Sequence, residues 1–298
     1  MRQTNKRALL AATAAGLFLS LSSCANLKNV YLQNSGINLP LEESRIVDIS
    51  VYSKKMDMPM PCRIYLPKGY GAGTDYLVLY GLNAFGANED MWINAGLTGS
   101  ADLLIDSGDI PPLIMVFPFT KDWTIKEIMV DLEDGKVDEP NIDQFICSEL
   151  VDYIDKRFDT IRSAKARSIC GFSMGGEIAL RTAFRHTKLF GEAGGYSPSV
   201  HSADYSDIQL EKWLFPNDDL SKTKNIVSYD KRKGLLKLSL YLYAGSAYDP
   251  FFAGVKSLQD ALEKRGIKSE FHPYDGGHSL DHNNRDFGNY LRFFFTEK

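Results

Sequence analysis

A serine in this sequence lies in a pattern that can turn a hydroxyl group into a nucleophile. The pattern G-x-S-x-G is matched by the pentapeptide Gly171-Phe172-Ser173-Met174-Gly175. It is typical of a sharp turn between a strand and a helix, which exposes the serine Oγ and needs small flanking residues to fit. A strand is predicted over residues 168–170 and a helix over residues 174–185, so the context suits such a turn. We therefore expect Ser173 to be a nucleophile.

The residues around this serine resemble a known family. The motif continues with Gly176, then Ala179-Leu180-Arg181, His186 and Leu189-Phe190-Gly191. In these residues the chain resembles the putative esterase (esterase D-like) family of α/β-hydrolases, over roughly residues 45–297. Members include feruloyl and acetyl-xylan esterases, S-formylglutathione hydrolases, siderophore esterases and mycolyltransferases. The resemblance implies an α/β-hydrolase fold, with a mostly parallel central sheet and helices on both faces.

A serine hydroxyl needs a general base, and one of five histidines is expected to supply it. In α/β-hydrolases the base follows the nucleophile and the acid in the chain, which favours a late histidine. His278 comes directly after the last predicted strand, and two glycines before it make a turn that can present its ring. The segment resembles the family's Gly-Gly-His segment, so His278 is the expected base. His282 is the alternative base, whereas His272 is expected to pack or face solvent within a strand.

The base needs an acid that orients it, and Asp249 is the candidate. Asp249 follows the buried strand predicted at 238–243, at the carboxyl end where catalytic groups gather in open α/β sheets. The family carries an aspartate in a comparable G-x-x-x-D setting. Asp249 would fix the tautomer of His278 and stabilise its imidazolium form. The rival carboxylates, which both lie very near the histidine in sequence, are Asp275 and Asp281.

Two backbone N–H groups are expected to bind the oxyanion that forms during acyl transfer. One belongs to Met174, directly after the nucleophile. The other lies in the segment Val78–Trp92, which aligns without gaps on a family segment and places the donor at Phe85. This chain departs from the family there, since Asn83 stands where the family usually has His and Ala84 where it has Gly. A backbone donor tolerates both changes unless position 84 requires a positive φ, which would strain an alanine.

Strands and helices alternate along the chain from residue 45 onward. Such alternation predicts a mostly parallel sheet covered on both faces. The segment 201–235 fits the alternation poorly and is expected to be an insertion above the sheet that shapes the substrate pocket. Strands are predicted at 45–52, 62–65, 76–80, 112–117, 168–170, 238–243 and 269–274, and helices at 101–106, 143–158, 174–185, 255–265 and 286–295.

The N-terminus carries a targeting segment. Basic residues precede the apolar stretch Ala8–Leu21, which is shorter than a membrane-spanning helix. Leu21-Ser22-Ser23-Cys24 follows and resembles the bacterial lipobox, in which the cysteine is diacylated and becomes the first mature residue. We therefore expect a lipid on Cys24 and a location in the bacterial cell envelope. The predicted segments are a signal peptide (1–23), a lipid-anchored tether (24–44) and an esterase domain (45–298).

Composition limits the partners and the chemistry. The 298 residues suit one large α/β domain. The net charge is −4, and no run of basic residues follows the N-terminus, so nucleic acid is excluded as a partner. The three cysteines that remain after lipidation have no paired spacing, which argues against disulfides or a zinc site. Buried free thiols are expected at Cys62, Cys147 and Cys170.

Together these residues predict a carboxylic ester hydrolase that works through an acyl-enzyme, without cofactor or metal. Acyl esters of carbohydrates, acetyl or feruloyl, are the expected substrates, on family analogy and location. A siderophore or another small ester, or transfer of the acyl group to an alcohol, is the alternative. A hypothesis of another class is a non-catalytic lipoprotein that binds glycans or a partner, which Asn83 and Ala84 would favour. Labelling by a fluorophosphonate separates the two classes, because it needs an activated serine.

Overall fold

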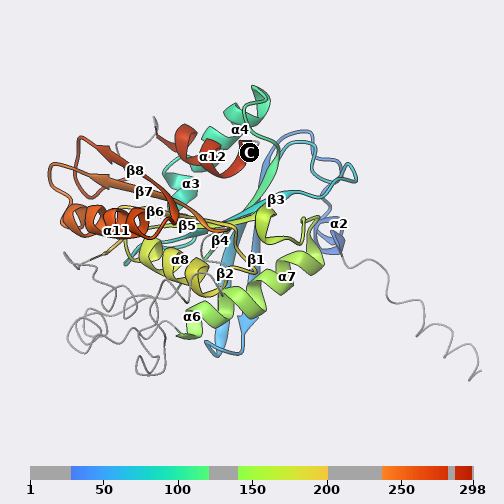
Figure 1. The fold of residues 1–298 in the computed structure, drawn as a ribbon. Coiled ribbons are helices and arrows are strands. Elements are labelled where there is room, and N and C mark those ends of the chain that lie inside the picture. The colour runs from blue at the N-terminus through green and yellow to red at the C-terminus, as the bar shows by residue number, and fades with distance from the viewer. Residues whose placement is uncertain (1–27, 121–139, 201–236, 281–285, 297–298) are drawn as a thin grey trace, which may run out of the picture.

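An eight-stranded sheet forms the centre of the molecule. The computed structural model describes residues 28–120, 140–200, 237–280 and 286–296 (Figure 1). The strand order is β1-β2-β4-β3-β5-β6-β7-β8. All strands after β2 run parallel to one another, and β1 and β2 form an antiparallel ribbon at one side, which confirms the predicted sheet. The strands are β1 (Arg45–Ser53), β2 (Met58–Leu66), β3 (Leu77–Leu82), β4 (Leu113–Pro118), β5 (Arg167–Phe172), β6 (Glu192–Tyr196), β7 (Ser239–Gly245) and β8 (Lys268–Tyr274).

Helices cover both faces of this sheet (Figure 1). The helices are α2 (Val30–Asn34), α3 (Met91–Asn94), α4 (Leu97–Asp106), α6 (Pro140–Gln144), α7 (Val151–Arg157), α8 (Met174–Arg185), α11 (Phe252–Lys264) and α12 (Phe287–Phe295). One core lies between the sheet and α2, α6, α7, α8 and α11, and a second lies between the sheet and α3, α4 and α12. Within the described ranges no helix combines the length and apolar character needed to cross a membrane.

Parallel strands give the sheet two functionally different ends. We call the end at which the parallel strands begin the amino end, and the end at which they finish the carboxyl end. Leu77 starts β3 and Arg167 starts β5 at the amino end. The carboxyl end carries the loops that follow these strands, among them the turn at Ser173. Side chains that come from distant parts of the sequence meet at this end.

Strand β6 is not predicted by the sequence. Its residues, Glu192–Tyr196, read EAGGY and lack the β-branched residues that mark a strand. Packing requires the glycines, because a Cβ on Gly194 would lie 2.4 Å from the hydroxyl oxygen of Tyr290 in α12. The helix predicted at 143–158 also differs, since a π-helical turn over Phe145–Leu150 separates α6 from α7.

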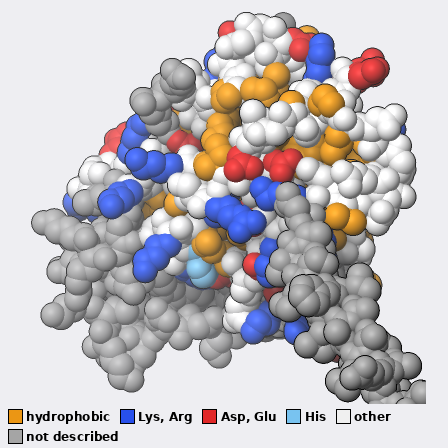
Figure 2. Space-filling view, turned by 90° about the vertical axis from the view of Figure 1, so that its right-hand side faces the viewer, with side chains coloured by type: hydrophobic (Ala, Val, Ile, Leu, Met, Phe, Trp, Pro, Cys, Tyr) orange, Lys and Arg blue, Asp and Glu red, His pale blue; other side chains and the backbone are white. Residues whose placement is uncertain are grey.

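The chain packs against the sheet from residue 28 onward, earlier than expected. Leu32 in α2 is fully buried, and the N–H of Leu41 donates to the carbonyl of Tyr70 at 2.9 Å. The predicted tether over 24–44 is therefore too long, because its second part belongs to the folded unit. The face on which α2 lies exposes Lys and Arg side chains beside apolar ones (Figure 2). Cys24 and the expected insertion at 201–235 lie outside the described residues.

Candidate active site

The turn between β5 and α8 holds Ser173 in a conformation that its neighbouring glycines allow. Ser173 has φ 56° and ψ −122°, a backbone geometry that L-residues rarely adopt. A Cβ on Gly171 would lie 2.1 Å from the carbonyl oxygen of Gly175, and one on Gly175 would lie 2.4 Å from that of Asn83. The N–H of Ser173 donates to the carbonyl of Tyr196 in β6 at 2.9 Å. The G-x-S-x-G spacing is thus a packing requirement of the turn.

His278 reaches this serine from the loop after β8. Its Nε2 lies 2.9 Å from the Oγ of Ser173, a hydrogen bond that the hydroxyl donates when this nitrogen is unprotonated. Phe172 stacks on the imidazole with ring centroids 4.8 Å apart, and Phe251 meets it edge-on at 5.0 Å. The two phenyl rings restrict the rotation of the imidazole, so His278 is held in position to take the hydroxyl proton.

Asp249 completes the arrangement from the loop after β7. Its Oδ1 lies 3.3 Å from the Nδ1 of His278 and accepts the N–H of Phe251 at 3.0 Å, while its Oδ2 accepts the N–H of Gly245 at 3.3 Å. Burial alone would raise the pKa of Asp249, but the neighbouring His278 imidazole, the Ser197 hydroxyl and the hydrogen bond from the Phe251 N–H lower it below its ordinary value. A carboxylate at this position orients the imidazole and stabilises its protonated form.

Asn83 braces the loop that follows β3. Its side chain is buried, and its Nδ2 donates to the carbonyls of Ala84 and Ala87 at 3.0 and 2.9 Å. Its Oδ1 accepts the N–H and the hydroxyl of Thr120 at 3.0 and 2.9 Å. The amide therefore makes four hydrogen bonds, which offset the free-energy cost of burying a polar side chain. The residue that departs from the family pattern is a structural support of this loop.

The two expected oxyanion donors belong to the start of α8 and to this loop. Met174 is the first residue of α8, where the helix itself offers no acceptor for its N–H. Phe85 lies between Ala84 and Gly86, and its side chain is 43% exposed. Gly86 has φ 69°, whereas Ala84 is not among the described non-glycine residues with positive φ. Ala84 therefore carries no strain from a positive φ, because the residue of this loop with a left-handed backbone conformation is Gly86.

Ser197 is a residue of this region that sequence reasoning missed. It follows β6, is fully buried and has φ 42°. Its N–H donates to the carbonyl of Tyr243 at 2.6 Å, and its hydroxyl is among the groups that lower the pKa of Asp249. A prediction of β6 would have located it, because the residue after a parallel strand lies at the carboxyl end of the sheet.

The remaining singled-out residues lie away from Ser173 or outside the described ranges. His272 contacts Glu270 at 3.2 Å and stacks on Tyr241 at 4.3 Å, as expected of a histidine within a strand. Cys62 and Cys170 are buried free thiols as predicted, and Cys147 is partly buried. Burial raises the pKa of Cys170 to about 12, so this thiol is protonated and unreactive at neutral pH. His201, His282 and Asp281 fall outside the described residues.

Asp143, Cys147 and His186 are the described residues that could hold a metal ion. One ligand atom of each lies within 4.8 Å of the others. His186 Nε2 is 3.1 Å and Cys147 Sγ is 3.5 Å from the Asp143 carboxylate. A guanidinium nitrogen of Arg185 lies 3.6 Å from the same carboxylate and opposes a second cation there. The cluster lies at the far end of α8 from Ser173 and joins α6 to α8 as a polar contact.

Solved structures of esterases share this fold. A ferulic acid esterase superimposes with a TM-score of 0.68 at 22% identity, covering 86% of this chain and 98% of its own. An S-formylglutathione hydrolase (FrmB) from Staphylococcus aureus superimposes with a TM-score of 0.63 at 15% identity, covering 87% of this chain and 99% of its own. At these identities the likeness establishes the α/β-hydrolase fold.

Curated relatives align over most of the chain. The uncharacterized protein YjcH of Bacillus subtilis is 24% identical over 227 residues, which are 76% of this chain and 88% of YjcH. An esterase of Mycobacterium tuberculosis is 25% identical over 244 residues, which are 72% of this chain. The chain spans about half the length of that esterase, 51%. The family model described as "Putative esterase" matches residues 53–293, and the protein therefore belongs to this esterase family.

Proposed function

We propose that this protein is a serine esterase in which Ser173, His278 and Asp249 form the catalytic triad. The observation that carries the proposal is the 2.9 Å contact between Ser173 Oγ and His278 Nε2. Ser173 lies in a strained turn between a strand and a helix, which is typical of an exposed nucleophile. Membership of the esterase family supports the same reaction. The buried carboxylate of Asp249 supplies the third member on the opposite side of the imidazole.

The triad geometry supports an acyl-enzyme mechanism. The Oγ of Ser173 attacks the ester carbonyl while Nε2 of His278 takes the hydroxyl proton. The C–O bond to the alcohol then breaks, and the alcohol leaves with the proton from Nε2, so the acyl group remains on Ser173. Water attacks the acyl carbon while Nε2 takes one of its protons. The bond between the acyl carbon and Oγ then breaks, Nε2 returns the proton to Oγ, and the acid is released with Ser173 restored. In both steps Asp249 stabilises the imidazolium.

Two N–H groups are proposed to bind the oxyanion of each tetrahedral intermediate. The proposed donors are those of Met174 and Phe85, which is supported by the close packing of Gly175, the residue after Met174, on the backbone of Leu82 and Asn83. One such donor contributes on the order of 10²–10³ in rate. The four hydrogen bonds of Asn83 support this role, since they hold the loop in a fixed position.

An ester with an aromatic acyl group or a sugar alcohol is the proposed substrate class. Two aromatic side chains in loops at the carboxyl end of the sheet are exposed, Phe85 at 43% and Tyr248 at 88%. Exposed aromatic rings stack well on flat acyl groups and on sugar rings. Structural neighbours include feruloyl esterases, one of them solved with ferulic acid and another with sinapinate. We propose acetyl or feruloyl esters of carbohydrates as substrates, and acylation of Cys24 as the means that holds the enzyme in the cell envelope.

Hydrolysis assays test the esterase directly. The full chain is expected to hydrolyse p-nitrophenyl acetate and butyrate, and the Ser173→Ala variant is expected to lose this activity while keeping its circular-dichroism spectrum. Acetylated, feruloylated and siderophore esters then identify the substrate class. A folded protein that turns over none of these esters would contradict the proposal and favour a binding protein on a hydrolase scaffold.

A further inference from the structure

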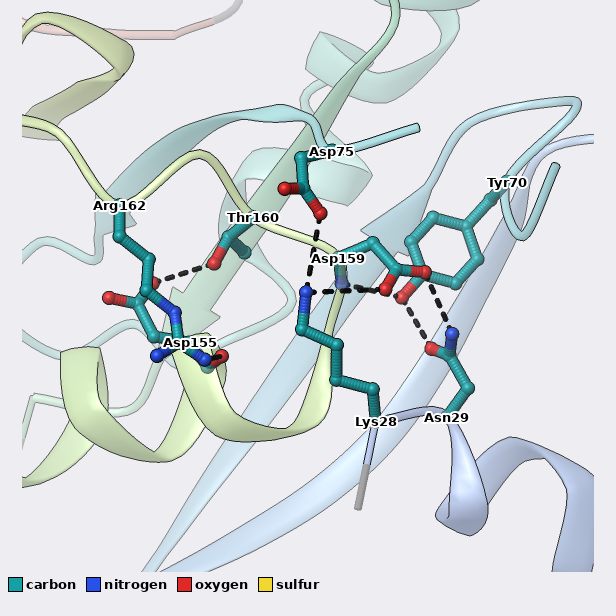
Figure 3. Close-up of polar contacts among 8 residues, drawn as sticks. All are labelled: Lys28, Asn29, Tyr70, Asp75, Asp155, Asp159, Thr160 and Arg162. Atoms are coloured by element: carbon teal, nitrogen blue, oxygen red, sulfur yellow. Dashed lines mark hydrogen bonds and ion pairs between the residues drawn. The ribbon is translucent and has the colours of Figure 1, made fainter. Parts of the chain in front are cut away.

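The first described residues are fixed to the amino end of the sheet by a cluster of polar contacts (Figure 3). Lys28 Nζ lies 3.2 Å from the carboxylate of Asp75 and 3.5 Å from that of Asp159. Asn29 Nδ2 donates to Asp159 at 2.7 Å, and the hydroxyl of Tyr70 donates to Asn29 Oδ1 at 2.6 Å. The backbone N–H of Asn29 also donates to the carbonyl of Arg157 at 2.8 Å. We call these residues the N-terminal clamp.

The N-terminal clamp lies at the opposite end of the sheet from the triad. Asp159 precedes Thr160, which pairs with Tyr76 immediately before β3, and the N–H of Tyr76 donates to the carbonyl of Asp159 at 2.9 Å. Ser173 follows the other end of β5, which is the neighbour of β3. A strand of six residues is about 20 Å long, so roughly that distance separates the clamp from Ser173 along the sheet.

Only a short stretch of chain separates the proposed lipid from the clamp. Cys24 and Lys28 are four residues apart in the sequence. Even fully extended, these residues reach at most about 14 Å. A lipid on Cys24 would therefore bring the clamp close to the bilayer, because the chain from residue 28 onward is packed on the domain.

The surface around the clamp suits a bilayer with anionic headgroups. The helix α2 exposes Val30 and Tyr31, at 37% and 42%, and the loop after α7 exposes Ile161 at 38%. Arg162 in the same loop and Lys165 in the following 3-10 helix, Ala164–Ala166, are exposed basic residues. Figure 2 views the molecule from the side on which α2 lies and shows Lys and Arg side chains, together with some Asp and Glu side chains, beside apolar ones. Apolar and aromatic side chains mixed with basic ones are typical of surfaces that contact membrane interfaces.

We propose that this amino-end surface, formed by Val30, Tyr31, Ile161, Arg162 and Lys165, rests on the bilayer and that the triad faces away from it. The inference depends on the proposed acylation of Cys24. It deepens the proposed function, because an active site about 20 Å beyond the membrane-facing end acts on esters outside the bilayer and not on its lipids. The clamp supports this orientation, since the chain from residue 28 onward is held on the domain.

Site-specific quenching tests the orientation. The full-length lipoprotein is placed in vesicles of phosphatidylethanolamine and phosphatidylglycerol that contain a headgroup-nitroxide lipid. A fluorophore is attached to Ser163→Cys at the amino end or to Tyr248→Cys at the carboxyl end, both in a Cys147→Ser background. We expect several-fold stronger quenching at position 163. Equal quenching, stronger quenching at 248, or a protein that does not float with the vesicles would overturn the proposal.

A second pair of variants tests the surface itself. Ile161→Ser is expected to weaken the quenching at position 163, whereas Tyr52→Ser is the matched control, because Tyr52 is 60% exposed at the distal end of β1. Identical quenching in both variants would overturn the role of Ile161. Hydrolysis of p-nitrophenyl acetate is measured on matching vesicles that carry the unlabelled wild-type lipoprotein. Hydrolysis without asymmetric quenching refutes only the orientation, and asymmetric quenching without hydrolysis refutes only the esterase.

Discussion

The two ends of the sheet are built by different means. At the carboxyl end, backbone contacts dominate: a Cβ on Gly175 would meet the carbonyl of Asn83 at 2.4 Å, and Ser173 and Ser197 both have positive φ. At the amino end, side chains dominate: Lys28 and Asn29 bind Asp159 through an ion pair and a hydrogen bond. Both ends join segments that are far apart in sequence, but only the carboxyl end holds the atoms that are proposed to react.

This difference follows from what each end has to do. Catalysis needs donor and acceptor atoms held within a fraction of an ångström, and backbone sterics provide such precision at the cost of local strain. A docked segment needs only a net attraction, which flexible side chains supply. Changes at the carboxyl end should therefore alter the reaction, and changes at the amino end should alter stability alone.

The largest effect is expected at the acid of the triad. Asp249→Asn keeps an acceptor for the backbone N–H groups but favours the wrong tautomer of His278. We expect kcat on p-nitrophenyl acetate to fall on the order of 10⁴-fold in a variant that keeps its circular-dichroism spectrum. Wild-type activity in this variant would show that Asp249 does not orient the base, and Asp275 would be the next residue to replace.

A methyl group at the turn should affect both reaction and stability. Gly175→Ala forces the loop at Asn83 away from α8, and with it the proposed donor at Phe85. We expect kcat to fall about 10²–10³-fold and the protein to lose about 1–3 kcal/mol of stability. Gly99→Ala is the matched control, because a Cβ there meets nothing within 4 Å and lies inside a helix. If both variants behaved alike, the backbone contact would be irrelevant.

Removing the clamp should affect stability without affecting the reaction. Asn29→Ala loses the hydrogen bonds to Asp159 and Tyr70, and we expect a loss of about 1–3 kcal/mol in urea unfolding with unchanged kcat. Asn29 has φ 61°, so Asn29→Gly separates the lost hydrogen bonds from backbone strain. A fall in kcat for either variant would mean that the two ends of the sheet are coupled.

Acid should reveal the smallest difference. The pKa of Asp249 is lower in the folded protein than in the unfolded chain, so its stabilising contribution is complete above the ordinary value of 3.8 and is lost as the pH falls below it. Melting curves of wild type and Asp249→Asn at pH 3 and pH 6 measure it: the gap between the two proteins should narrow at pH 3. A gap that widens in acid contradicts the lowered pKa.

Much of the carboxyl end could be predicted because its requirements leave marks in the sequence. The pattern around Ser173 indicates positions where only glycine fits sterically, and Gly276 and Gly277 before His278 indicate a turn. The helix over 174–185 is predicted with both ends correct. Its start is marked by the G-x-S-x-G motif, and its length by the helical spacing of the apolar residues that follow. The resemblance to a known family supplied Phe85 and supported Asp249.

The rest depends on contacts that no local pattern contains. Strand β6 was missed because α12 requires glycines there, against the intrinsic preference of strands. Ser197 was missed with it. The clamp at Lys28 and Asn29 cannot be predicted from the sequence, because polar residues without periodicity resemble a linker. Their partner Asp159 also lies 130 residues away from Asn29. Asn83 departs from the family pattern, and its supporting role depends on four hydrogen bonds that the sequence does not reveal.

The most direct test of the central claim is whether Ser173 is an activated nucleophile. Intact-mass measurement after treatment with a fluorophosphonate should give one adduct on the wild-type chain at pH 7, and peptide mapping should place it on Ser173. Ser173→Ala should give no adduct, and His278→Ala should react far more slowly. A folded wild-type protein that stays unlabelled, or that is labelled equally in the Ser173→Ala variant, would contradict the account.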